Sequence, residues 1–266
     1  MPFTPSHAVV ALPFVRTRLV PAAIAVGAMT PDLPLFVRGM WPGYGLTHDF
    51  AWLPVTVAVA FVLLLIWRCV LRPATRELLP RPVAQRLPVE WDTGARAALR
   101  ESVGGGLPGI LWLVVSLALG VASHIAWDLF THEGRVGEQL LPALAGQWGS
   151  FTGAKWLQHA SSALGVVVLG IFALVWLSRR RPEPVRRVIP DAARWAWWVS
   201  LPVALIGASL AAIAVQGPFD ADYTPTHLIY GVLTKVAAAW AALTLALALF
   251  VQSRQARAVT RETASR

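Results

Sequence analysis

The residues best suited to chemistry lie in one apolar stretch, residues 123–132, with the sequence SHIAWDLFTH. His124 and Asp128 are four residues apart, so on a helix they share one face at about 5–6 Å. That spacing suits two ligands of one metal ion, or of two adjacent ions. Imidazole with carboxylate is the ligand set of zinc and similar divalent metals. His132 lies one turn further along and somewhat rotated, where it could serve a second ion or bind a substrate phosphate.

The elements that would carry these residues are membrane-spanning helices. Of the 266 residues, 56% are hydrophobic and 14% are charged, against roughly 45–50% and about 25% in soluble domains. Crossing about 30 Å of hydrocarbon needs roughly 20 apolar residues. Five segments meet this requirement: 51–71, 107–130, 158–177, 195–215 and 228–251. We therefore predict an all-α polytopic membrane bundle in which residues 1–266 form a single domain.

Arginines set the expected orientation of this bundle. The formal charge of +9 comes almost entirely from arginine, because Lys155 and Lys235 are the only lysines. Arginines gather in the loop 72–106, in the loop after the third span and in the tail 252–266, and the intervening loops hold few. Loops rich in Lys and Arg stay cytoplasmic. These three segments, with the C-terminus, are expected on the cytoplasmic side. Since the arginines flank apolar runs, no nucleic-acid partner is expected.

The stretch 7–29 is apolar but interrupted by Pro13, Arg16, Arg18 and Pro21, so two interpretations compete. It could cross the membrane once, which would put His7 inside. Alternatively, two short helices fold back as a re-entrant hairpin, which is tolerated where protein surrounds it. We favour the hairpin, with residues 5–50 forming a hairpin and site loop.

The predicted topology brings the histidines to one membrane face, the outer one. Ionisable residues at such positions are costly and by default mark function. Asp32 lies between two prolines, in a rigid turn that could hold a bridging or supporting carboxylate. The histidines at this face are His48, His124, His132, His159 and His227, joined by His7 if the hairpin is correct.

Several of these polar residues also have purely structural interpretations. Asp49 could be the N-cap of the first long helix, and His227 could cap or border the fifth. Gln158 could cap the third span as easily as touch a substrate. His124 and Asp128 could also form a structural pair inside their helix.

Four motifs in order carry a resemblance to a known family. They are MPFTPSH at residues 1–7, GAMTPD at 27–32, the 123–132 run and LQHASS at 157–162. Together they resemble the bacterial membrane proteins catalogued as domain of unknown function family 4184, over nearly the whole chain. That family is similar to a group labelled membrane-bound metal-dependent hydrolases. The His-x-x-x-Asp pattern also resembles the zinc-binding pattern of bacterial zinc-dependent phospholipases C.

The resemblance implies a ligand set and a location. Metal ligands would be His7, Asp32, His48, His124 and Asp128, with His132 and His159 as further candidates. The resemblance to bacterial membrane proteins places the chain in the bacterial cytoplasmic membrane.

Two functions from different classes follow. In the first, the chain is a membrane-embedded hydrolase that uses one or two divalent ions, expected to be zinc, on a phospholipid or another lipid-linked ester at the outer face. His132 or His159 would act there as general acid or base, or would bind phosphate. In the second, the chain transports an ion or small molecule, because broken helices and intramembrane carboxylates also build ion pathways. A structural membrane protein without catalysis is a third interpretation.

Overall fold

The computed structural model describes residues 3–39, 41–185 and 187–264, and these form two compact units. The described residues of 1–34, 39–65 and 100–179 form the first unit, and those of 35–38, 66–99 and 180–266 form the second. Among the described residues, five helices are long and apolar enough to cross a membrane. They are Phe50–Leu78, Gly106–Thr131, Gly153–Ser178, Asp191–Gln216 and Pro225–Ala258. The prediction of an all-α polytopic bundle is confirmed.

In the first unit the chain begins with a helical hairpin. A 3₁₀ helix, η1 (Thr4–Phe14), is followed by a turn and by α1 (Pro21–Met29), and the two pack against each other. Thr4 at the start of η1 donates a hydrogen bond from Oγ1 to Oδ2 of Asp32, 2.7 Å away, just beyond the end of α1. The two ends of the hairpin therefore meet, as the predicted hairpin requires.

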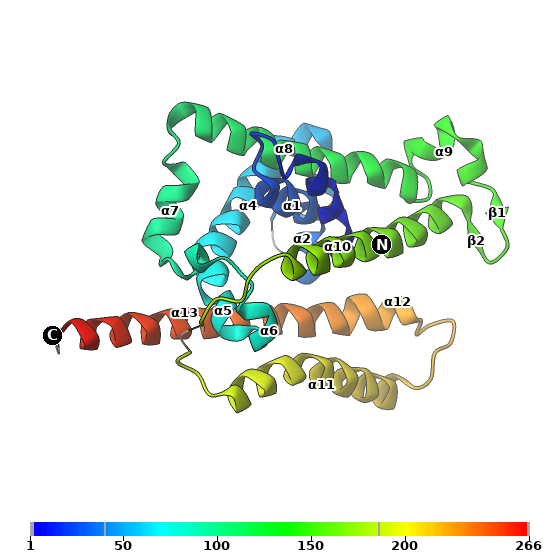
Figure 1. Cartoon of the computed structure of the whole chain (residues 1–266). Coiled ribbons are helices and arrows are strands. Elements are labelled where there is room, and N and C mark those ends of the chain that lie inside the picture. The colour runs from blue at the N-terminus through cyan, green and yellow to red at the C-terminus, as the bar shows by residue number, and fades with distance from the viewer. Residues whose placement is uncertain (1–2, 40, 186, 265–266) are drawn as a thin grey trace. The chain divides into compact units, whose positions relative to one another are not determined.

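This hairpin lies on α8 (Gly106–Thr131), and η1 also contacts α10 (Gly153–Ser178), as Figure 1 shows. The crossing of α1 and α8 depends on two glycines. A Cβ built on Gly120 would lie 2.2 Å from the carbonyl oxygen of Ile24, and one on Gly27 would lie 2.4 Å from that of Leu117. Small residues let membrane helices approach at backbone distance. Gly27 and Gly120 thus fix where the end of α1 stands beside α8.

Short helices then carry the chain from the hairpin into the first span. They are η2 (Thr30–Asp32), α2 (Leu33–Phe36), α3 (Tyr44–Thr47) and η3 (Phe50–Trp52), which leads into α4 (Leu53–Ile66). Thr47 donates from Oγ1 to the carbonyl oxygen of Pro31 at 2.7 Å, so α3 is held against η2. Beyond α8, the first unit continues through α9 (Val136–Leu140), η6 (Pro142–Leu144) and the two-stranded hairpin of β1 (Gln147–Trp148) and β2 (Phe151–Thr152) to α10.

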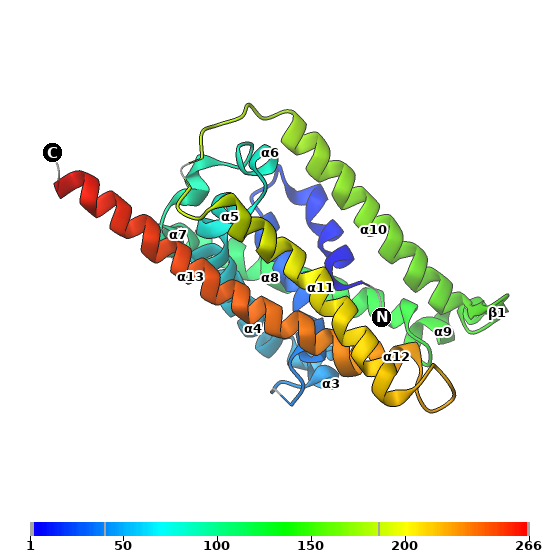
Figure 2. The same cartoon turned by 90° about the horizontal axis from the view of Figure 1, so that it is seen from below.

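The second unit contains the end of the first span and the last two spans. A π-helical turn, η4 (Trp67–Leu71), leads into α5 (Arg72–Leu78), followed by α6 (Arg81–Ala84), η5 (Val89–Asp92) and α7 (Ala95–Val103), which runs into the first unit. The antiparallel pair is α11 (Asp191–Gln216) with α12 (Pro225–Leu228), the π-turn η7 (Ile229–Leu233) and α13 (Thr234–Ala264), seen side by side in Figure 2. Ala74 and Leu78 of α5 pack with Ala248 and Val251 of α13 in a small core.

Helix ends differ from the sequence prediction where polar residues continue a helix. The helix that contains the first predicted span continues beyond residue 71 and ends at Leu78. Helix α13 likewise continues through the predicted tail to Ala264. The predicted cytoplasmic loop 72–106 holds four helical segments. Arginine is a good helix former, so a charged stretch ends a membrane span without ending the helix.

Candidate metal centre

Three histidines and two aspartates from four segments meet inside the first unit. The carboxylate of Asp128 is central: its Oδ2 lies 3.5 Å from Nε2 of both His48 and His124, and its Oδ1 lies 3.9 Å from Nε2 of His7. Oδ1 of Asp32 lies 3.7 Å from Nε2 of His48 and 3.8 Å from that of His124. All five residues are buried. We refer to them as the His/Asp cluster.

Backbone carbonyls fix the orientation of two of the imidazoles. Nδ1 of His124 lies 2.7 Å from the carbonyl oxygen of Ala28, and Nδ1 of His48 lies 2.9 Å from that of Tyr44. A carbonyl oxygen can only accept, so Nδ1 is the protonated donor in both rings. Histidines that bind metals are commonly held in this way, with the second ring nitrogen donating to a carbonyl or carboxylate.

As a result, the lone pair on Nε2 of His48 faces the lone pair on Nε2 of His124. The Nε2 atoms of His124 and His48 are 3.2 Å apart, and with Nδ1 protonated in both rings, neither neutral ring has a proton to place between them. Two lone pairs at this distance repel unless a cation, either a proton or a metal ion, lies between or beside them. The arrangement is that of a cation site.

Other atoms of the cluster also lack partners. Among the described residues, Nε2 of His7, Oδ1 of Asp32 and both carboxylate oxygens of Asp128 are buried without a hydrogen bond. Leaving a buried polar atom unpaired costs about 1–3 kcal/mol, and more for a charged group. Four such atoms in one place could bind a metal ion, since metal ions coordinate imidazole nitrogen and carboxylate oxygen directly.

The spacing of the ligand atoms tests whether a metal ion fits. Bonds of about 2.0–2.2 Å in a tetrahedron separate two ligand atoms by roughly 3.4 Å. The contacts between ligand atoms given above run from 3.2 to 3.9 Å. Two groups of three have ligand atoms within 4.8 Å of one another: His7, Asp32 and His124, and His48, His124 and Asp128. The residues present therefore fit a divalent ion, and the two oxygens of Asp128 face both groups.

The surroundings of His7 and His48 shift the pKa values of these two histidines in opposite directions. Burial, reinforced by the neighbouring His124, lowers the pKa of His7 from 6.5 to about 4. Burial also acts to lower the pKa of His48, but the neighbouring carboxylates of Asp128 and Asp32 outweigh it and raise that pKa to about 9. The lowered pKa favours the neutral ring of His7 at physiological pH, whereas the two carboxylates favour positive charge at His48.

His132 lies at the edge of the cluster, turned toward Asp128 and Gln158. Its Nδ1 is 3.5 Å from Oδ2 of Asp128, and its Nε2 is 3.3 Å from Nε2 of Gln158. Gln158 is buried, and Thr152 rather than Gln158 is the N-cap of α10. The capping interpretation of Gln158 is therefore wrong, because the helix begins five residues earlier, at Gly153. Gln158 instead orients His132.

The remaining polar residues of the sequence analysis have other roles in the described structure. His159 is exposed, with its ring 5.4 Å from that of Phe151, so the structure does not bring it to the cluster. Asp49 is an N-cap, accepting from the backbone nitrogen of Ala51 at 2.9 Å, as predicted. His227 completes a capping box with Thr224 at the start of α12, which confirms its structural interpretation.

Three supporting groups were not found from the sequence. The carbonyls of Ala28 and Tyr44 are backbone atoms, so no residue type reveals them. Thr4, which donates to Asp32, lies in the motif at the beginning of the chain, four residues into MPFTPSH. Its position three residues before His7 in the same motif was the available signal.

Comparison with family models places most of the chain, residues 1–253, in one family. No curated protein and no solved structure matches it. The family model described as "Domain of unknown function (DUF4184)" matches residues 1–253, which include the hairpin, the His/Asp cluster and all five long apolar helices up to residue 253. This membrane-spanning helical protein therefore belongs to the DUF4184 family.

Proposed function

We propose that the protein is a membrane-embedded metal-dependent hydrolase that acts on a phospholipid or another lipid-linked ester. The observation that carries the proposal is the 3.2 Å approach of the Nε2 atoms of His48 and His124, each with Nδ1 donating to a carbonyl. This arrangement favours a cation between the two rings, and we infer that the cation is a metal ion because carboxylates without hydrogen bonds lie beside them. His7, Asp32 and Asp128 would complete the ligand set, with one or two ions, and zinc is the metal that we expect for nitrogen and oxygen ligands.

The surroundings of the cluster support hydrolysis rather than metal storage. A divalent ion held there supplies Lewis-acid activation of water and stabilises developing negative charge. His132 lies beside Asp128 outside both groups of three ligands, so it is available to take a proton from the attacking water and return it to the leaving alcohol. Hydrolysis adds the water oxygen to the acyl or phosphoryl group and breaks the ester bond.

The location of the cluster argues for a lipid substrate. His124 and Asp128 lie in the last third of the span Gly106–Thr131, and His132 follows its end. Residues at such a depth meet the ester and phosphate region of a bilayer. We propose the outer face of the bacterial cytoplasmic membrane, with the C-terminus on the cytoplasmic side, because arginines concentrate on the loops at the other ends of the spans.

The test begins with the metal content of the purified full-length chain. We expect about one or two equivalents of zinc by elemental analysis. The double variant His124→Ala/Asp128→Ala should lose this metal, whereas the control variant His227→Ala should retain it. Cobalt substitution provides a second readout, because visible absorption reports nitrogen and oxygen ligands directly. Retention of the full metal content by a folded double variant would end the proposal.

The second stage measures turnover. The protein in mixed micelles with phospholipids should release product, lose activity on chelation and regain it on addition of Zn²⁺. A protein that binds metal, turns over no lipid ester and carries metal ions into liposomes would be a transporter, and this outcome would overturn the hydrolase proposal while keeping the metal centre.

A further inference from the structure

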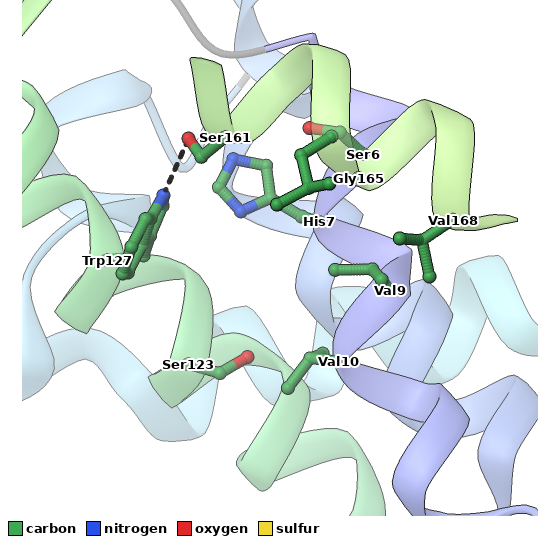
Figure 3. Close-up of a pocket in the computed structure, with 10 residues that line it drawn as sticks. Ser6, His7, Val9, Val10, Ser123, Trp127, Ser161, Gly165 and Val168 are labelled. Carbon is green, nitrogen blue, oxygen red and sulfur yellow. Dashed lines mark hydrogen bonds between the residues drawn. The ribbon is translucent and has the colours of Figure 1, made fainter. Parts of the chain in front are cut away.

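A cavity of about 440 Å³ lies between η1, α8 and α10, beside the His/Asp cluster (Figure 3). Its size falls in the range of sites that bind small molecules, roughly 300–1,000 Å³. The walls are formed largely by apolar side chains: Val9 and Val10 of η1, Trp127 of α8, and Leu164 and Val168 of α10. We call it the η1–α8–α10 groove.

Two serine hydroxyls in the wall, those of Ser123 and Ser161, are already used within the protein. Ser123 donates from Oγ to the carbonyl oxygen of Gly120 at 2.7 Å. Ser161 donates to the carbonyl oxygen of Gln158 at 3.1 Å and accepts from Nε1 of Trp127 at 3.3 Å, the contact drawn in Figure 3. A polar occupant would find few free partners, and burying an unpaired polar group is costly. The walls therefore favour a hydrocarbon occupant.

His7 connects the groove to the cluster. The ring lines the groove, and its Nε2 lies 3.9 Å from Oδ1 of Asp128 on the cluster side. In Figure 3 the ring stands between Ser161 and Trp127 on one side and Val9 and Val168 on the other. An occupant of the groove thus has one end beside the ligand atoms of the cluster.

The origin of the occupant follows from the helices that form the wall. Both α8 and α10 are apolar enough to cross a membrane, and Leu164 of the wall is 64% exposed. The groove is therefore reached from the hydrocarbon of a bilayer, where the chains available are those of lipids. Near Ser6 the groove is bounded by the contact of η1 with Gly165, at which a Cβ would lie 2.9 Å from Cβ of Ser6.

We propose that the η1–α8–α10 groove binds one hydrocarbon chain of a phospholipid and thereby places its ester linkage beside His7. Chain binding stands on the groove alone, and the position of the ester rests on the proposed hydrolase function. The groove would make the enzyme select substrates by their chain rather than by the headgroup only.

The test uses a phosphatidylglycerol with a photoactivatable diazirine on one acyl chain, in nanodiscs with the full-length protein. Cross-links mapped by peptide mass spectrometry should concentrate on Val9, Val10, Leu164 and Val168. The variant Val168→Trp fills the groove and should reduce these cross-links about tenfold, equivalent to about 1.4 kcal/mol, because the indole takes the space that the chain would occupy.

The matched control is Val167→Trp on the same helix. Val167 is 55% exposed and does not line the groove, so the cross-links should stay as in the unchanged protein. Cross-links spread over the exposed face of α10 in proportion to exposure, and unaffected by Val168→Trp, would show an adventitious lipid layer only and overturn the proposal.

Two further results separate this proposal from the hydrolase. Val168→Trp should keep its metal, because the residue does not touch the cluster, and His124→Ala/Asp128→Ala should keep the cross-links. Chain binding would be established if the double variant lost its metal but kept the normal cross-link pattern, and if Val168→Trp abolished that pattern. This conclusion would hold whatever the outcome of the turnover assay. If Val168→Trp left turnover and chain-length preference unchanged, the groove would not position the ester.

Discussion

Two buried groups of charged side chains, one in each unit, differ in how their atoms are partnered. In the second unit, Glu77 accepts from the backbone nitrogens of Val188 and Ile189 at 3.1 and 3.0 Å, and Oε1 also accepts from Nη2 of Arg194 at 3.0 Å. Nε of Arg194 donates to the carbonyl oxygen of Glu77 at 2.6 Å, and Nη1 donates to Asp191. Both carboxylate oxygens of Glu77 are thus satisfied by the protein itself.

The His/Asp cluster of the first unit is built in the opposite way. Nδ1 of His124 donates to the carbonyl oxygen of Ala28 and Nδ1 of His48 to that of Tyr44. Four of the atoms that face inward have no hydrogen bond within the described part of the chain. Burial alone therefore does not identify a functional site. In a structural ion pair, the atoms that face inward have hydrogen-bond partners within the protein. In a ligand site, hydrogen bonds on the outer side orient the side chains, and the atoms that face inward are left without partners.

The largest expected effect comes from neutralising each carboxylate in turn. Glu77→Gln should lower the free energy of unfolding by about 3–5 kcal/mol, because it leaves the buried Arg194 without its counter-charge and turns an amide donor toward backbone donors. Above pH 9, where His48 is neutral, Asp128→Asn should cost the metal-free protein about 1 kcal/mol, since the atoms it replaces have no hydrogen bonds to lose. Thermal unfolding in detergent, with and without metal, measures both.

Metal addition sharpens the same comparison. At a free ion concentration near 1,000 times the dissociation constant, Zn²⁺ should stabilise the unchanged protein by about 4 kcal/mol. It should stabilise Glu77→Gln equally and Asp128→Asn much less. If Asp128→Asn destabilised the metal-free chain as much as Glu77→Gln does, the cluster would be a structural ion group like its counterpart.

A smaller effect on stability is expected from a substitution where α1 crosses α8, because this crossing positions residues of the cluster. Gly120→Ala would bring a methyl group to 2.2 Å from the carbonyl oxygen of Ile24, so α1 must move away from α8. We expect a loss of about 1–3 kcal/mol in stability and weaker metal binding, because Ala28 and Asp32 move with the end of α1. The control Gly170→Ala on α10 meets nothing within 4 Å and should be neutral or stabilising by up to about 1 kcal/mol. Equal metal affinity in both variants would contradict the positioning role.

The sequence was sufficient, for physical reasons, for the long helices and for the pairing of His124 with Asp128, whereas the full set of five cluster residues came from the family resemblance. Apolar runs of this length have few alternatives to membrane helices, and the i, i+4 spacing of His124 and Asp128 predicts a shared face whatever the packing. The hairpin followed from Pro13 and Pro21, but the distance at which it packs depends on Gly27 and Gly120, whose significance appears only once two helices meet.

The roles of two adjacent residues could not be assigned from the sequence. Gln158 and His159 stand side by side, and residue type favours histidine for chemistry. Their orientation on α10 decides otherwise, because neighbours on a helix point about 100° apart. Gln158 is the one that contacts His132, and His159 lies against Phe151.

The smallest expected effect is a change in kcat that distinguishes Gln158 from His159. Gln158→Ala should keep its metal and its thermal midpoint within about 1 kcal/mol but lower kcat about tenfold with KM little changed, because His132 loses the group that orients it for proton transfer. His159→Ala should leave kcat, KM and metal content unchanged. Steady-state kinetics on phospholipid in mixed micelles measures both variants. If His159→Ala abolished turnover while Gln158→Ala was silent, proton transfer would belong to the exposed histidine, and the contact of Gln158 with His132 would be packing alone.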